Sequence, residues 1–286
     1  MEMKYLRSGS GKPLLLIHGL GGNAKSWSTI WPALAERRDL IAIDLPGFGD
    51  TPRLAGETSI RTLSDAVTSF IDAQGLRGID VVGSSMGGRL VLELARRGGV
   101  VGSVVSLDPG GFWRGWERHA FFSSIWLSIR AVRLLQPLIP AISRSKVART
   151  MLLAQFSRRP WALHPAVVLE EMRAYAQATA FDELLYDLAY GEEQKGALGG
   201  SIEAPLVIGW GRNDRVCFAN QAQRALALFP DARLQWFERC GHFPHWDAPQ
   251  DTVRLILDNA ARQKNPATAA APIAHSGVLG SGASAH

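Results

Sequence analysis

The stretch Val81-Val82-Gly83-Ser84-Ser85-Met86-Gly87-Gly88 decides the fold of this chain. A strand-like apolar run from Ile79 leads into it, and a helix-like run from Arg89 to Arg97 follows it. A strand that turns sharply into a helix through small residues exposes the side chain at the tip of the turn. The free N–H groups at the start of the helix point to the same place. The pattern favours Ser85 as a nucleophile, the alternative being a glycine-rich turn with an incidental serine.

The composition predicts a globular chain with a large core. Of its 286 residues 47% are hydrophobic, and the formal net charge is only +5. The two cysteines, Cys217 and Cys240, are too few for a disulfide framework and favour a reducing compartment. No apolar signal segment is visible at the N-terminus. The best candidate for a membrane span, Ala120 to Leu135, is interrupted by Arg130 and Arg133. We therefore expect a soluble, cytoplasmic protein.

Strand-like and helix-like patterns alternate over the first part of the chain. The strand-like runs are 13–17, 40–45, 78–82 and 100–107, and helical runs include 27–37 and 60–74. This alternation predicts an α/β fold with a doubly wound, mostly parallel sheet, which binds ligands at the C-terminal ends of its strands. Four polar residues follow such ends: His18, Asp44, Ser85 and Asp108.

The alternation stops near residue 111 and resumes after residue 200. The segment between contains only helical periodicity and loops, with four of the nine tryptophans. We predict that residues 111–200 form a helical cap over the site, and that 1–110 and 201–263 form the two parts of the core. Residues 264–286 contain no acids and almost no large apolar groups, so we expect this tail to be disordered.

Two polar residues in the second part of the core can complete a site around Ser85. Asp214 follows the strand-like run 205–209, and His242 follows the run 232–237. A serine hydroxyl needs an imidazole to take its proton, and the imidazole needs a carboxylate to fix its tautomer. Asp108 is a rival for the carboxylate because it also ends a strand. The Pro-Gly-Gly after it is typical of an exit into the cap, so we prefer Asp214.

The chain resembles the α/β-hydrolase superfamily in five segments. They are His18–Gly22 (HGLGG), Asp44–Gly49 (DLPGFG), Gly83–Gly87 (GSSMG), Gly211–Asp214 (GRND) and Gly241–His245 (GHFPH). The resemblance implies an α/β-hydrolase fold in which Ser85 is the nucleophile, His242 the base and Asp214 the orienting acid.

The resemblance also implies an oxyanion hole made by the N–H groups of Leu20 and Met86. Haloalkane dehalogenases and epoxide hydrolases carry aspartate where this chain has Ser85. The serine therefore implies a route through an acyl-enzyme.

The other polar residues near these motifs are given structural roles. We expect His18 to hold the oxyanion loop, Asp44 to fix a turn, and His245 to take no part in catalysis. Cys217 and Cys240 are expected to be packed thiols, because no spacing typical of a metal site occurs. The loop at Gly19 to Gly22 lacks a following Lys-Ser/Thr, so it does not indicate a nucleotide. We expect no cofactor, no metal and no nucleic-acid partner.

Three functions remain open for such a site. Asp108 to Gly111, the Gly-x-Ser-Met-Gly-Gly form and Arg173 are similar to meta-cleavage product hydrolases, which cut a carbon–carbon bond in dienoic keto acids. The chain departs from them because Phe243 stands where they commonly have tryptophan, and because its oxyanion loop is shorter. We therefore prefer a carboxylesterase or lipase-like enzyme acting on a small-molecule ester. A non-catalytic binding protein on the same fold is the third alternative.

The first part of the cap combines apolar and basic residues. Between Gly111 and Pro160 there are nine basic residues and one acid, Glu117. We expect the apolar residues to cover the acyl group, with Trp113, Trp126 and Phe243 as pocket candidates, and the arginines to form a solvated outer face. A weak contact with anionic membrane surfaces is a further expectation from the same charges.

Overall fold

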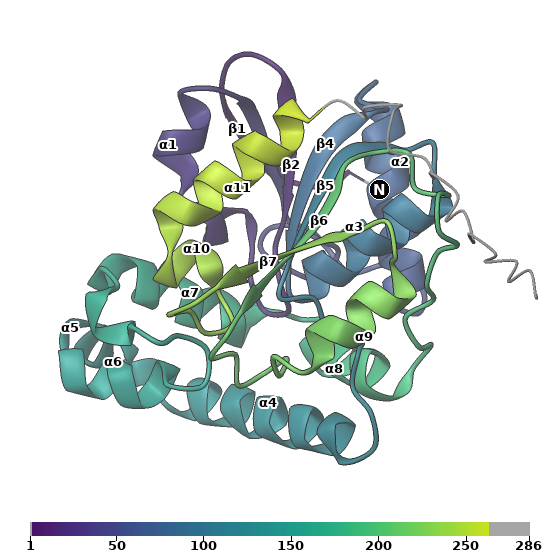
Figure 1. The fold of residues 1–286 in the computed structure, drawn as a ribbon. Coiled ribbons are helices and arrows are strands. Elements are labelled where there is room, and N and C mark those ends of the chain that lie inside the picture. Colours follow the sequence, from purple (N-terminus) through teal and green to yellow (C-terminus); the bar gives the residue numbers. More distant parts are fainter. Residues whose placement is uncertain (1, 263–286) are drawn as a thin grey trace, which may run out of the picture.

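The computed structural model describes residues 2–262, and the tail predicted for 264–286 lies outside them. The centre of the molecule is a seven-stranded sheet in the order β1-β3-β2-β4-β5-β6-β7 (Figure 1). β1 is antiparallel to β3, and all other neighbouring strands are parallel. The predicted doubly wound, mostly parallel sheet is confirmed. The strands are β1 (Tyr5–Gly9), β2 (Pro13–Ile17), β3 (Asp39–Ile43), β4 (Ile79–Ser84), β5 (Val101–Leu107), β6 (Leu206–Gly211) and β7 (Arg233–Phe237).

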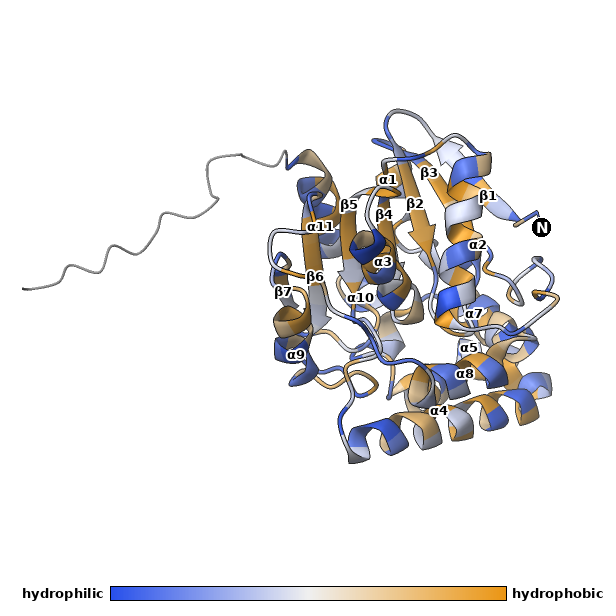
Figure 2. Cartoon of the chain, turned by 90° about the vertical axis from the view of Figure 1, so that its right-hand side faces the viewer, coloured by the Kyte–Doolittle hydropathy of each residue, from blue (hydrophilic) through white to orange (hydrophobic). Residues whose placement is uncertain are grey.

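Helices cover both faces of the sheet because its central strands are apolar on both sides. In β2, Leu14 and Leu16 belong to one apolar cluster, and Leu15 and Ile17 to the other. Figure 2 shows this concentration of hydrophobic residues on the central strands. The first cluster includes residues of α1 (Trp31–Ala35) and α11 (Pro249–Ala261), and the second includes residues of α2 (Ile60–Ala73), α3 (Met86–Arg97) and α9 (Gln221–Leu228).

The first predicted helix is shorter than expected. The sequence predicts a helix over 27–37, but the structure has a 3₁₀-helix η1 (Ala24–Trp27), a turn, and then α1 from Trp31 to Ala35. Proline has no N–H and is tolerated only in the first turn of a helix. Pro32 therefore requires a helix that begins beside it, while Trp27, Ile30 and Leu34 remain buried.

The chain between β5 and β6 forms a helical insertion. It lies at the C-terminal ends of the strands, in the lower part of Figure 1. Prolines divide it, because Pro137 and Pro140 each stand in the first turn of a new helix. Its elements are α4 (Trp116–Leu134), η2 (Gln136–Leu138), α5 (Ile139–Arg144), α6 (Lys146–Leu153), η3 (Pro160–Ala162), α7 (Pro165–Gln177) and α8 (Phe181–Tyr190). The short helix α10 (Pro244–Asp247) follows β7.

Hydrogen bonds fix the insertion to the core. A carboxylate oxygen of Asp187 in α8 accepts the N–H of Ile60 at the start of α2, at 2.8 Å. The N–H of Thr179 donates to the carbonyl of Gly47, at 2.9 Å. The buried Arg89 of α3 donates to carbonyl oxygens near the end of α8. The insertion is therefore held over the strand ends by contacts at several points.

Among residues 2–262, no individual helix combines the length and apolar character needed to cross a bilayer. One bent pair, α4 followed by Gln136–Arg144 at an angle of 65°, meets the requirement by length and composition.

Candidate active site

Ser85 lies at a strained turn between β4 and α3. Its φ is +56°, a left-handed value that is uncommon for a residue with a side chain. Glycine is required on both sides of it. A Cβ on Gly83 would lie 2.0 Å from the carbonyl oxygen of Gly87, and a Cβ on Gly87 would lie 2.1 Å from that of Ile17. The glycine pattern in the sequence thus lets the first turn of α3 pack against the strand ends.

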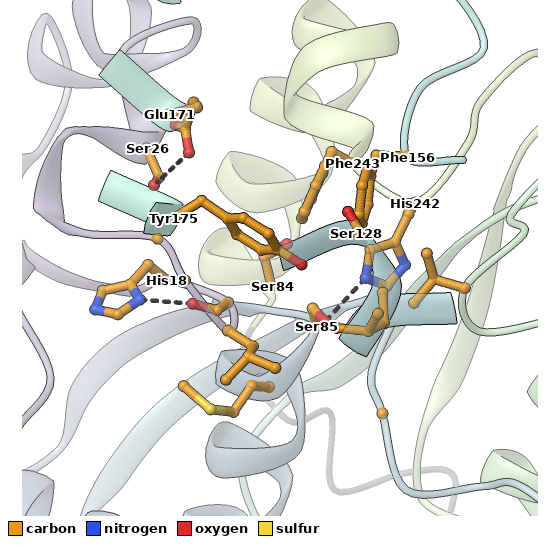
Figure 3. A pocket seen from close by; sticks show the side chains of 18 of the residues that line it. His18, Ser26, Ser84, Ser85, Ser128, Phe156, Glu171, Tyr175, His242 and Phe243 are labelled. Carbon is orange, nitrogen blue, oxygen red and sulfur yellow. Dashed lines mark hydrogen bonds between the residues drawn. The ribbon is translucent and has the colours of Figure 1, made fainter. Parts of the chain in front are cut away.

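The structure brings Ser85, His242 and Asp214 together in one hydrogen-bonded chain. Nε2 of His242 lies 2.9 Å from the Ser85 hydroxyl, and Nδ1 lies 2.8 Å from a carboxylate oxygen of Asp214 (Figure 3 shows the serine–histidine bond). The second Asp214 oxygen accepts the backbone N–H groups of Val216 and Cys217. Because a carboxylate can only accept, Nδ1 carries the imidazole proton and Nε2 is free to take one from the serine.

Asp108 lies beside this chain but does not bind the histidine. One of its oxygens accepts the N–H of Gly211 at 2.8 Å, and its side chain is fully buried. Burial, and then the nearby charge of Asp214, raise the pKa of Asp108 well above its ordinary value. The raised pKa favours the protonated form of Asp108, which suits a supporting role, with Asp214 as the carboxylate that orients His242.

Leu20 and Met86 have backbone N–H groups beside the Ser85 hydroxyl. Met86 is the first residue of α3, and Leu20 follows β2 in the loop that contains Gly19. A Cβ on Gly19 would lie 3.1 Å from the Ser85 Cβ, so the two loops are in close contact. Within residues 2–262 neither N–H is used in a hydrogen bond, and both residues line the pocket. The two groups are available to an oxygen that develops negative charge.

His18 holds the loop of Leu20 in place. Its Nε2 accepts the N–H of Leu45 at 3.0 Å, so Nδ1 carries the proton and donates to the carbonyl of Gly19 at 2.8 Å. Burial lowers the pKa of His18, which keeps this neutral form. Asp44 accepts two backbone N–H groups from the neighbouring loops, as expected of a residue that fixes a turn.

The pocket next to Ser85 is mostly apolar. It encloses about 900 Å³, counted with its opening to solvent, between the strand ends and the helical insertion. Trp113 stacks on Phe121 with ring centroids 4.0 Å apart, and Phe243 stacks on Phe156 at 6.0 Å. No lysine or arginine is present among the lining residues that the structure describes. Other apolar lining residues are Leu20, Ile125, Val132, Leu152, Leu153, Met172 and Leu188.

The structure corrects the placement of Trp126, which the sequence indicated as a pocket residue. Trp126 does not line the pocket; its side chain is 43% exposed, and the Arg130 guanidinium lies 5.2 Å from its ring centroid. In α4 the positions 121, 125, 129 and 132 face inward at helical spacing, which places residue 126 on the opposite side. Arg173 is exposed on α7 and is likewise absent from the pocket wall.

His245 and the two cysteines form no hydrogen bond with the Ser85 hydroxyl among residues 2–262. His245 is buried against the ring of Trp27, with centroids 5.0 Å apart, and burial lowers its pKa to about 3. Cys217 and Cys240 are buried free thiols whose pKa burial raises. Possible ligand atoms of Asp214, Cys217 and His242 do lie within 4.8 Å of one another. A thiol that resists ionisation is a poor metal ligand, so this group fits the hydrogen-bonded chain better than a metal site.

Sequence reasoning missed two polar residues of the pocket, Glu171 and Tyr175. Both lie on α7 and are buried, and a Cβ on Gly21 would collide with the Tyr175 ring. Their helical spacing in the sequence could have identified both residues. Glu171 and Tyr175 are four residues apart, on the same helical face as the buried Val168 and Met172. An acid on an apolar helix face indicates either a buried partner or a functional group.

Comparisons with known proteins agree with this geometry. The model of the alpha/beta hydrolase family matches residues 14–255. The chain is 25% identical to 2-hydroxy-6-oxononadienedioate/2-hydroxy-6-oxononatrienedioate hydrolase 1 of Dechloromonas aromatica, over 90% of each chain. The crystal structure of a membrane phospholipase A aligns with a TM-score of 0.69 and 27% identity, covering 90% of this chain and 83% of that one.

Another relative is longer than this chain. The dihydrolipoyllysine-residue acetyltransferase component of the acetoin cleaving system of Cupriavidus necator is 29% identical over 90% of this chain. The chain spans about two thirds of the length of that protein, 66%.

Proposed function

This chain belongs to the alpha/beta hydrolase family, and we propose that it is a serine hydrolase that cleaves a carboxylic ester with an apolar acyl group. The observation that carries the proposal is the chain of hydrogen bonds from Asp214 through His242 to Ser85, which ends in an apolar pocket. Serine is a weak nucleophile by itself, and an adjacent oriented imidazole is the arrangement that activates it.

The proposed reaction has two halves. The Ser85 oxygen attacks the ester carbonyl while Nε2 of His242 takes the hydroxyl proton, and the N–H groups of Leu20 and Met86 bind the oxyanion. His242 then gives its proton to the departing alcohol, which leaves an acyl group on Ser85. In the second half His242 takes a proton from water, the hydroxide attacks the acyl carbonyl, and Ser85 leaves with the proton. Each oxyanion donor contributes on the order of a hundredfold to a thousandfold in rate.

The pocket favours an ester over the carbon–carbon bond of a dienoic keto acid. Such a keto acid carries a carboxylate, and a buried carboxylate needs a cation or several hydrogen-bond donors. The lining residues described by the structure include no arginine or lysine, and Arg173 points to solvent. The likeness to a phospholipase A and to a carbon–carbon bond hydrolase is compatible with either reaction. The charge of the pocket wall supports the ester.

Turnover of p-nitrophenyl esters of increasing acyl length, with one dienoic keto acid alongside, tests the proposal. We expect p-nitrophenol release that increases with acyl length until the pocket is filled, and little or no keto-acid cleavage. Faster cleavage of the keto acid than of every ester would instead assign carbon–carbon bond hydrolysis.

We also expect EDTA to leave ester turnover unchanged. If EDTA lowered the turnover and an added metal ion restored it, the metal-independent mechanism would be contradicted.

A further inference from the structure

A carboxyl group in the pocket wall, that of Glu171, has no role in the proposed reaction. The carboxyl group of Glu171 lines the pocket from α7 and is only 9% exposed. Among residues 2–262, one side chain forms a hydrogen bond with this carboxyl group: the hydroxyl of Ser26 donates to it, at 3.2 Å (Figure 3). Figure 3 shows this pair on the opposite side of Ser85 from His242. A buried carboxyl group with a single neutral donor is poorly compensated when it is ionised.

No cation in the described part of the pocket neutralises Glu171. The adjacent Glu170 is paired with Lys25, at 3.0 Å, and that pair is partly exposed outside the pocket. The other titratable groups at this end of the pocket are His18, His245 and Tyr175. Burial lowers the pKa of both imidazoles and raises the pKa of the Tyr175 phenol, so all three groups stay uncharged. Both imidazoles are therefore neutral around neutral pH, and Glu171 is the group that changes the charge of this wall.

We propose that Glu171 makes the pocket selective against acyl groups that carry a negative charge. This inference rests on the proposed ester hydrolysis and specifies its substrate class as esters of uncharged acids. An ionised Glu171 repels a carboxylate that shares the same pocket, because the wall around it is mostly apolar and its described lining residues include no lysine or arginine. Amides, hydroxyl groups and hydrocarbon chains are not subject to this repulsion. The same repulsion also favours release of the carboxylate product after each turnover.

The selectivity depends on pH in a defined direction. Burial raises the pKa of Glu171 to about 7, and the nearby Glu170 adds to the increase. Glu171 is mostly protonated and neutral below that value and ionised above it. Discrimination against an anionic acyl group is therefore weak at mildly acidic pH and increases as pH rises through about 7. Catalytic steps that the two kinds of ester share cancel in the ratio of their rates.

Two esters that differ in one charge measure this selectivity. The first is the mono-p-nitrophenyl ester of adipic acid, and the second is the same ester with its far carboxyl group converted to a carboxamide. The quantity is the ratio of kcat/KM for the amide to kcat/KM for the acid, measured from about pH 6 to about pH 8, a range in which the adipate carboxyl stays ionised. The variant is Glu171→Gln, whose amide oxygen can still accept from Ser26, and the matched control is Glu170→Gln.

In the wild type and in Glu170→Gln we expect the ratio to increase on the order of tenfold across this range. In Glu171→Gln we expect a ratio that is low and independent of pH, with thermal unfolding close to that of the wild type. A Glu171→Gln ratio that increases as in the wild type would overturn the inference, as would a flat ratio in the wild type. If the wild type hydrolyses neither these esters nor the p-nitrophenyl ester series, the proposed function itself fails, and this inference with it.

Discussion

Two residues with side chains have a positive φ in the described chain, and they stand at neighbouring strand ends. Ser85 follows β4 with a φ of +56°, and Asp108 follows β5 with a φ of +43°. The N–H of Ser85 donates to the carbonyl of Leu107, and the N–H of Asp108 to that of Gly209. Backbone strain of this kind persists only where surrounding contacts impose it. Here the strained backbone places the Ser85 hydroxyl next to His242 and the Asp108 carboxyl group next to that of Asp214.

Asparagine at position 214 should be far more damaging than asparagine at position 108. Asp214→Asn removes the acceptor that fixes the His242 tautomer, and we expect kcat to fall roughly 10⁴-fold on the precedent of serine proteases. Asp108→Asn keeps an oxygen for the N–H of Gly211 and leaves the bond between Asp214 and His242 in place, so its loss of kcat should be much smaller. Steady-state kinetics on a p-nitrophenyl ester compares the two. A larger loss in Asp108→Asn would mean that Asp108 is the orienting acid.

Single residues were predictable from the sequence where a backbone motif determines them. Ser85, Asp214 and His242 each follow a strand in a recognisable local pattern, and the structure brings all three together. Trp126 was misplaced because its position depends on the rotation of α4 about its own axis, which packing against α7 and α8 determines. Glu171 was missed because its carboxyl group lines the pocket only when α7 packs over the strand ends.

At the scale of elements, the junction of β4 and α3 depends on glycine at position 87. A methyl group there would lie 2.1 Å from the Ile17 carbonyl oxygen, and backbone cannot move as a flexible side chain can. We expect Gly87→Ala to lower the free energy of unfolding by about 3 kcal/mol or more. Gly56→Ala is the control, since its Cβ would meet nothing within 4 Å, and it should change stability by less than about 0.5 kcal/mol. Urea unfolding measures both; equal stabilities would show that the junction can relax.

A second prediction concerns Asp247, which joins the insertion to the loop of His242. Its buried carboxylate accepts the N–H of Gly241 and the N–H of Arg158, each at 2.7 Å, and the hydroxyl of Ser157. Asp247→Ala leaves these donors unsatisfied and should destabilise the fold by about 3 to 5 kcal/mol. Asp251→Ala, in an exposed pair with Arg254, should have little effect. If the two variants unfolded at the same denaturant concentration, the stabilising role of Asp247 would be contradicted.

The sequence predicted most elements but not all of their limits. Central strands were recognised because they are apolar on both faces, whereas β1, exposed along its length at the sheet edge, has no such signal. The predicted helix over 27–37 was too long because helical spacing of Trp27, Ile30 and Leu34 outweighed the proline at position 32. Helical spacing alone cannot distinguish one long helix from two short turns that bury the same residues.

At the scale of the whole molecule, the surface of the insertion combines exposed apolar and basic side chains. Leu134, Leu138, Val147 and Met151 are exposed on α4 to α6. Four of the nine basic residues that suggested a membrane contact are engaged elsewhere: Arg118, Arg130 and Arg133 pair with acids, and Arg149 is buried against backbone carbonyls. Exposed basic residues without an ion pair in the described chain include Arg144 and Lys146, on either side of the turn between α5 and α6.

We propose that this surface binds anionic membranes weakly, through Arg144, Lys146 and the apolar side chains around them. Each basic residue near an anionic bilayer contributes about 1 kcal/mol. Co-sedimentation with anionic vesicles should weaken roughly tenfold or more in the double variant Arg144→Gln, Lys146→Gln, and in high salt. Arg37→Gln, at the N-terminal end of β3, should have no effect. Equal sedimentation with neutral and anionic vesicles, or none with either, would rule out the contact.

The most direct test of the central claim, that Ser85 is an activated nucleophile, is covalent labelling by a fluorophosphonate followed by intact mass measurement and peptide mapping. We predict one adduct per chain, located on Ser85, in the wild type and in Ser84→Ala, and none in Ser85→Ala. Thermal unfolding should show that both variants remain folded, and loss of the nucleophile should lower kcat on the order of 10⁶-fold. A wild type that takes up no label, or a folded Ser85→Ala variant that is labelled or hydrolyses esters as fast as the wild type, would contradict the account.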